Sequence, residues 1–151
     1  MFEKAANKGH ADGMFFLGAL YTEGLGVARD YTKARELFEK AAEKGNEDAM
    51  ARLGNLYAEG LGVPQDYTKA REWFEKAAEK GNADAMAHLG NLYTKGLGVT
   101  QDSAKAREWY EKAADKGGAS ATAYLKKLST REVAGARSRA RASARRPLDR
   151  N

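Results

Sequence analysis

The 151-residue sequence contains no cysteine, so it has neither a disulfide framework nor thiolate ligands for a metal. It also lacks any run of about 18 consecutive apolar residues, the length at which a segment becomes a candidate membrane span. Its first ten residues, MFEKAANKGH, lack the basic and apolar regions of a signal peptide. Together these absences favour a cytoplasmic location.

Residues that carry chemistry are equally scarce. The two histidines, His10 and His88, lie far apart without ligand-spaced partners, so we expect no metal site. The G-x-G of each GLGV segment lacks the lysine and the serine or threonine of a phosphate-binding loop, and we interpret it as a helix end followed by a turn. The sequence therefore predicts a protein that is not an enzyme, with no cofactor and no small-molecule substrate.

The net charge of +5 is concentrated at the C-terminal end. Residues 131–151 hold seven arginines against Glu132 and Asp149, whereas the rest of the chain has 19 basic and 19 acidic residues. We therefore separate an Arg/Ala-rich tail, 129–151, which is predicted to be disordered or, as an alternative, a weak helix up to Pro147. Such a tail could contact nucleic acid or an anionic membrane surface by counterion release, or have no role at all.

The rest of the chain consists of a 36-residue repeat. Full copies occupy 17–52, 53–88 and 89–124; the first two agree at 29 of 36 positions and the last two at 25. A fixed period of this length predicts an all-α solenoid of stacked helix-turn-helix units, in which neighbouring units bury the core between them.

Partial units flank the three full copies. The segment 1–16 opens partway through the second helix of an incomplete unit, with Phe2 and Gly9 lying 36 residues before Phe38 and Gly45. A last helix is predicted to begin near Tyr124 and to continue to about residue 128, so the repeat array spans 1–128.

Each unit contains two predicted helices, named helix A and helix B. Helix A runs from about Asp48 to Glu59 and is followed by Gly60 and a loop, and helix B runs from about Tyr67 to Lys80 behind the capping Asp66. The apolar positions of helix A have helical spacing and are predicted to be buried, as are five positions of helix B: Ala70, Trp73, Phe74, Ala77 and Ala78.

A glycine recurs inside helix A at Gly18, Gly54 and Gly90. Because glycine costs roughly 1 kcal/mol against alanine within a helix, its return predicts a crossing with helix B that is too close for a Cβ atom. Replacing Gly54 with leucine should therefore destabilise the fold.

The repeat carries the pattern A-x-x-x-L-G-x-x-Y-x-x-G-x-G-V-x-x-D-x-x-K-A-x-x-W-x-x-K-A-A-x-x-G, from Ala49 to Gly81. This pattern resembles the Sel-1-like repeat, a relative of the tetratricopeptide repeat, over about residues 1–128. The resemblance implies a right-handed α/α superhelix that acts as an adaptor for protein complexes, often in bacterial signalling and host contact. One branch of that family is secreted and carries a disulfide in each repeat, and the cysteine-free sequence departs from it.

Three positions of helix A vary between repeats that are otherwise nearly identical. They read Phe, Arg, His at 16/52/88, Ala, Asn, Asn at 19/55/91, and Glu, Glu, Lys at 23/59/95. Their i, i+3, i+7 spacing puts them on one helix face, which related solenoids use as the concave side. The predicted partner-binding residues are Phe16, Arg52, Asn55, Glu59, His88, Asn91 and Lys95.

Two functions remain open at this stage. The favoured one is a scaffold or adaptor that binds a peptide or protein partner on the concave helix A face. In the alternative, the basic tail contacts nucleic acid or an anionic membrane and the solenoid is a passive scaffold. Variation by drift on an idle surface would explain the helix A differences without any partner.

Overall fold

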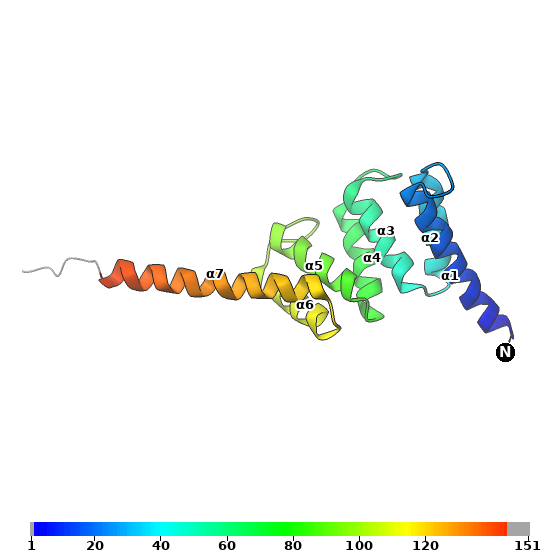
Figure 1. Cartoon of the computed structure of the whole chain (residues 1–151). Coiled ribbons are helices and arrows are strands. Elements are labelled where there is room, and N and C mark those ends of the chain that lie inside the picture. The colour runs from blue at the N-terminus through cyan, green and yellow to red at the C-terminus, as the bar shows by residue number, and fades with distance from the viewer. Residues whose placement is uncertain (1, 145–151) are drawn as a thin grey trace, which may run out of the picture.

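The computed structural model describes residues 2–144, with side chains from Gly9 to Ala142, and this part of the chain contains helices and no strand. The helices are α1 Phe2–Glu23, α2 Tyr31–Glu43, α3 Glu47–Glu59, α4 Tyr67–Glu79, α5 Ala83–Lys95, α6 Ser103–Asp115 and α7 Ala119–Ala144. They form an elongated stack from α1 to α6, and α7 projects from its far end (Figure 1). The predicted all-α solenoid is thus confirmed.

Helices pair within each unit and then stack between units. α1 packs on α2, α3 on α4 and α5 on α6, and the pairs are joined through α2 with α3, α4 with α5 and α6 with α7. The helices in position A are therefore α1, α3, α5 and α7, and those in position B are α2, α4 and α6. Each unit packs mainly against its sequence neighbours, as a solenoid requires.

Local capping sets the helix ends close to where the sequence predicts them. The Asp66 carboxylate accepts a hydrogen bond from the backbone N–H of Lys69 at 3.1 Å, and this cap recurs at the start of α2 and α6. Gly60 ends α3 in the left-handed region, with φ of 67°. Only glycine takes this conformation without steric cost, so helix A ends at Gly60, the first residue of the GLGV segment.

The core lies between the A and B helices. Its largest fully buried side chains are Phe38, Phe74, Leu53 and Leu89. The prediction that Trp73 belongs to this core is only partly right, because its ring is half-buried at the rim. The Lys76 ammonium lies 4.5 Å from the Trp73 ring centroid, so the solvent-facing side of the indole carries a cation–π contact.

The recurring glycine of helix A marks a close crossing, as predicted. A Cβ atom on Gly54 would lie 2.4 Å from Cε1 of Phe74, and at Gly18 and Gly90 the corresponding distance to an aromatic ring is 2.7 Å. The neighbour is therefore an aromatic ring of helix B, seated against the glycine.

The N-terminal end differs from the prediction. Gly45 and Gly81 follow complete B helices and have φ values of 90° and 89°, which separate helix B from the next helix A. Gly9 holds the same place in the repeat, yet α1 passes through it as one continuous helix. Seven residues of α1 precede Gly9.

At the C-terminal end, residues 129–144 are helical, as in the alternative of a weak helix, and not disordered. Residues 129–144 continue α7, because alanine and arginine are both strong helix formers and the packed first turns supply a nucleus. Lys126 occupies the position of Gly90, so a further helix B could not cross α7 as closely as in the other units. Residues 145–151 lie outside the described part. None of the described helices is long and apolar enough to cross a membrane.

Candidate partner-binding surface

A cleft of about 240 Å³ opens between α1, α3 and α5, and we call it the helix A cleft. It brings together three of the seven predicted partner-binding residues, Arg52, Asn55 and His88. The residues that complete its lining are Phe15, Asp48, Ala51, Asn82 and Asp84. The other predicted residues, Phe16, Glu59, Asn91 and Lys95, do not line this cleft.

Asparagine–aspartate pairs hold the A helices together beside the cleft. The Asn82 amide donates to the Asp48 carboxylate at 3.1 Å, and Asn46 donates to Asp12 at the same distance. The Asn82 side-chain oxygen also accepts from the backbone N–H of Ala85 at 2.8 Å. One side chain thus caps its own helix and fixes it to the preceding helix A.

Sequence reasoning missed these polar residues as parts of the site. Asn46 and Asn82 repeat at 36-residue spacing, as do Asp12, Asp48 and Asp84, so the signal was present but indicated only a helix cap. In the next unit the asparagine is replaced by Gly118, and the amide link is not repeated at Asp84. The carboxylate of Asp84 is exposed at the cleft.

His88 is held by packing as well as exposed to the cleft. Its ring stacks on Phe74 of α4, with centroids 4.8 Å apart and planes 16° from parallel, and Tyr124 stacks on Tyr110 in the next unit. The side chain at this variable position is therefore also held by packing. Burial lowers the pKa of His88, opposed by the charges of Asp84 and Glu59, and so favours the neutral imidazole.

The cleft is lined by side chains of both charges. Arg52 supplies a guanidinium on the exposed side of α3, while Asp48 and Asp84 supply carboxylates. The lining offers both hydrogen-bond donors and acceptors beside the ring of Phe15. No group of three metal-binding side chains occurs among the described residues.

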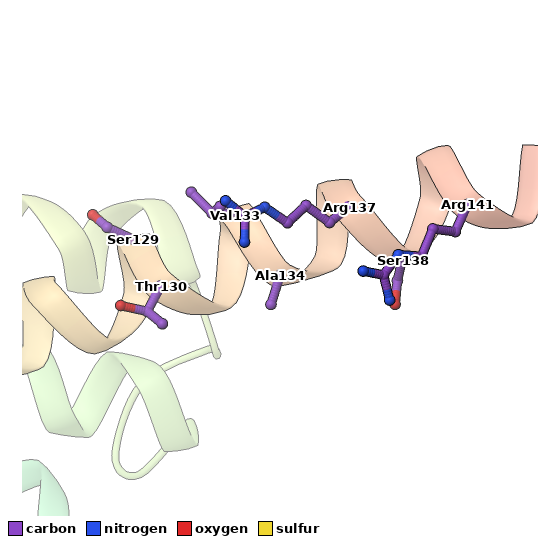
Figure 2. A pocket seen from close by; sticks show the side chains of 7 residues that line it. All are labelled: Ser129, Thr130, Val133, Ala134, Arg137, Ser138 and Arg141. Atoms are coloured by element: carbon purple, nitrogen blue, oxygen red, sulfur yellow. The ribbon is translucent and has the colours of Figure 1, made fainter.

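A second surface lies along α7. One face of this helix carries Ser129, Thr130, Val133, Ala134, Arg137, Ser138 and Arg141. Figure 2 shows these side chains on a single helix with no opposing wall, so the face is open and not a closed pocket. An ion pair between Arg107 of α6 and Glu132 connects the middle of α7 to the stack.

A comparison of the sequence with known protein families agrees with the repeated helix pairs of the structure. A model described as Sel1 repeat matches residues 1–10, 11–46, 47–82 and 83–118. The chain belongs to the Sel1 repeat family. Proteins of this family generally act as protein-interaction scaffolds.

Solved Sel1 repeat structures resemble this chain closely. A Sel1 repeat protein from Oxalobacter formigenes is 34% identical with a TM-score of 0.69, and 74% of this chain aligns with 46% of that protein. A protective antigen of uropathogenic Escherichia coli with an SLR fold is 39% identical with a TM-score of 0.76, and 87% of this chain aligns with 28% of it.

A third solved structure, cysteine rich protein B of Helicobacter pylori, is 27% identical with a TM-score of 0.59, and 63% of this chain aligns with 71% of it. The chain spans less than half the length of the first two relatives. No curated protein matches it.

The Sel1 matches and the predicted units share one period but differ in phase. Matches begin at residues 47 and 83, where α3 and α5 start, and at residue 11 within α1, whereas the predicted units begin six residues later. In a stacked array, the residue at which one repeat is said to end and the next to begin is a matter of definition. With the bounds of the Sel1 matches, each full repeat contains one helix A followed by one helix B.

Proposed function

We propose that this Sel1 repeat array is an adaptor that binds a peptide or protein partner on its helix A layer, centred on the helix A cleft. The observation that carries the proposal is that three residues at variable positions gather around one cleft: Arg52 and His88, which differ from their counterparts in both neighbouring repeats, and Asn55, which differs from Ala19. The packing residues are nearly identical between repeats. Recognition of one partner would therefore appear as differences at the surface positions.

The size and polarity of the cleft support a peptide as the ligand. A volume of about 240 Å³ is below the roughly 300–1,000 Å³ of typical small-molecule pockets and suits one inserted side chain. Arg52 can donate to a carbonyl or carboxylate, and Asp48 and Asp84 can accept from amides or a cation. Glu59, Asn91 and Lys95 would extend these contacts along α3 and α5, and the exposed ring of Phe16 would add an apolar contact on α1.

We expect a combined helix A variant to lose its partner while staying folded. It carries Arg52→Ala, Asn55→Ala, Asn91→Ala and His88→Tyr; tyrosine is chosen because Tyr124 stacks in the equivalent place. Single exposed charges contribute under about 1 kcal/mol, so only the combination should weaken capture clearly, by tenfold or more. Proteins retained from a lysate by the immobilised chain would be quantified by mass spectrometry.

The matched control alters the opposite layer at Thr68, Glu72 and Glu79, which are exposed on α4. This helix B variant should keep the partner, and both variants should melt within a few degrees of the parent. If the helix B variant loses the partner and the helix A variant keeps it, the recognition face has been assigned to the wrong layer.

A second candidate function rests on α7. Its arginines Arg131, Arg137, Arg139 and Arg141 are all exposed, and the helix projects away from the stack (Figure 1). Cationic side chains on an isolated helix are suited to a polyanion, because binding releases condensed counterions.

We expect the full chain to bind duplex DNA with an affinity that falls steeply as salt rises. Replacing Arg137, Arg139 and Arg141 with glutamine should flatten the slope of log affinity against log salt by up to about 2.7, from roughly 0.9 per phosphate contact. Fluorescence anisotropy with a labelled duplex measures this. Binding to phosphatidylserine vesicles without binding to DNA would assign α7 to a membrane surface, and equal binding by the glutamine variant would remove its role.

A further inference from the structure

A pocket lies where α5, α6 and α7 meet, at the end of the stack from which α7 projects (Figure 1). Its volume is about 350 Å³, at the lower end of the roughly 300–1,000 Å³ of typical ligand pockets. We call it the α6 pocket, and its walls include Thr94 of α5, Ser103 and Ala104 of α6, and Tyr124 and Leu128 of α7. It shares no lining residue with the helix A cleft and is therefore a separate site.

The start of helix B differs in this unit from the two units before it. Both α2 and α4 begin with a tyrosine followed by a threonine, whereas α6 begins with Ser103 and Ala104. The tyrosines, Tyr31 and Tyr67, are partly buried and pack against the core. The third unit therefore lacks an aromatic ring at a place where the other two have one, and Ser103 lines the pocket there.

The hydrogen-bond donor that serves the ring in the second unit is retained in the third. The Gln65 amide donates to the Ala58 carbonyl at 2.8 Å and to the Tyr67 hydroxyl at 2.9 Å. The Gln101 amide likewise donates to the Thr94 carbonyl, at 2.9 Å. Its second bond has no phenol to reach, because α6 begins with a serine. The amide is thus held in the same way with one N–H left for a ligand.

The α6 pocket is also uncovered on the side where a next unit would pack. In the first two units the following GLGV segment lies over the start of helix B. A Cβ on Gly62 would lie 2.7 Å from the carbonyl carbon of Tyr31, and one on Gly98 would lie equally close to that of Tyr67. No GLGV segment follows α6, and α7 continues as one helix to Ala144. Ser103 is therefore exposed to solvent.

We propose that the α6 pocket binds a hydroxyphenyl group, in the place that the Tyr67 ring fills in the second unit. The ring would lie against Leu128 and the ring of Tyr124, and its hydroxyl would accept a hydrogen bond from the Gln101 amide. Contact with these side chains buries the apolar faces of the ring, and the placed donor selects for the hydroxyl. The proposal depends neither on the helix A cleft nor on the charge of α7.

A titration with 4-methylphenol, which is the side chain of tyrosine, tests the site in the full chain. Amide NMR shifts report binding, and we expect the amides of Gln101, Ser103 and Ala104 to move, with a Kd of about 1 mM for a ligand of this size. Toluene lacks the hydroxyl and should bind about fivefold more weakly, because one hydrogen bond is lost. Unmoved amides up to the solubility limit, or equal binding of toluene, would overturn the proposal.

Two variants probe the ring and the donor separately. Ser103→Tyr restores the ring from within the chain, so it should abolish binding of 4-methylphenol and raise Tm by about 2–5 °C. Gln101→Ala removes the donor and should make 4-methylphenol bind no better than toluene. The matched control is Ser120→Tyr, since Ser120 is exposed on α7 and does not line the pocket. Unchanged binding by Ser103→Tyr, or a fivefold preference that survives in Gln101→Ala, would contradict the site.

A peptide identifies the source of the ring. Acetyl-glycyl-tyrosyl-glycinamide presents the same hydroxyphenyl group on a backbone, and the phenylalanyl peptide is its control without the hydroxyl. Shifts of the same three amides with the tyrosyl peptide would assign the site to a tyrosine of a protein partner. Shifts with 4-methylphenol alone would assign it to a small free phenol. Both outcomes support the α6 pocket as a hydroxyphenyl site, and the absence of both would refute it.

Discussion

Replacing Gly54 with alanine should lower the free energy of unfolding by about 1–3 kcal/mol, and replacing it with leucine should lower it further. The added Cβ would lie 2.4 Å from Cε1 and 2.5 Å from Cδ1 of Phe74, whose ring is 1% exposed and has no free space to enter. Urea denaturation of the full chain measures the change.

Gly13→Ala serves as the matched control for this prediction. Both glycines lie within an A helix, but a Cβ on Gly13 meets nothing within 4 Å. It should therefore gain up to about 1 kcal/mol from helix propensity alone. The double variant Gly54→Ala with Phe74→Leu should recover part of the loss, because the smaller side chain relieves the overlap. If Gly54→Ala were as stable as Gly13→Ala, the ring would not be seated on the glycine.

Replacing Gly62 with alanine should also be strongly destabilising, by about 3 kcal/mol. Gly62 has φ of 73°, and this conformation alone costs a non-glycine residue roughly 1–2 kcal/mol. In addition, its Cβ would lie 2.7 Å from the carbonyl carbon of Tyr31 and 2.9 Å from its oxygen. These are backbone atoms of the preceding unit, which cannot rotate away, so the overlap adds about 1 kcal/mol or more.

Gly26→Ala isolates the conformational part of that loss. Gly26 has φ of 74° in the equivalent loop, but nothing lies within 4 Å of its Cβ position. Its variant should lose only about 1–2 kcal/mol, and the difference from Gly62→Ala measures the contact between units. Equal losses in the two variants would mean that the loop of one unit does not touch the helix of the unit before it.

Only some residues of the candidate site could be predicted from the sequence. Variation between repeats identified Arg52, Asn55 and His88, because variable positions are easily distinguished from a repeated core. The same comparison did not identify Asp48 and Asn82, because these residues recur in the preceding repeat and looked like ordinary capping residues. A hydrogen bond between units spans 34 residues, and no local pattern shows which carboxylate an asparagine amide will reach.

The sequence alone determined the period, the family and the bounds of the internal helices. Those features depend on local chemistry: an aspartate three residues before the N–H it accepts from, and a glycine that takes a left-handed φ at Gly60. Ends of the array could not be read in this way. The equivalent position of the repeat is a turn at Gly45 and part of a continuous helix at Gly9.

Tertiary structure decided burial and the shape of the surface. Leu17 and Leu53 stand in the same local sequence, L-G-x-L-Y, yet one is 40% exposed and the other is fully buried. Among the described helices, α3 packs on both α2 and α4, whereas α1 packs mainly on α2. Helix propensity acts within a few residues, but the hydrophobic effect depends on what a neighbouring unit brings into contact, and that neighbour lies a full repeat away.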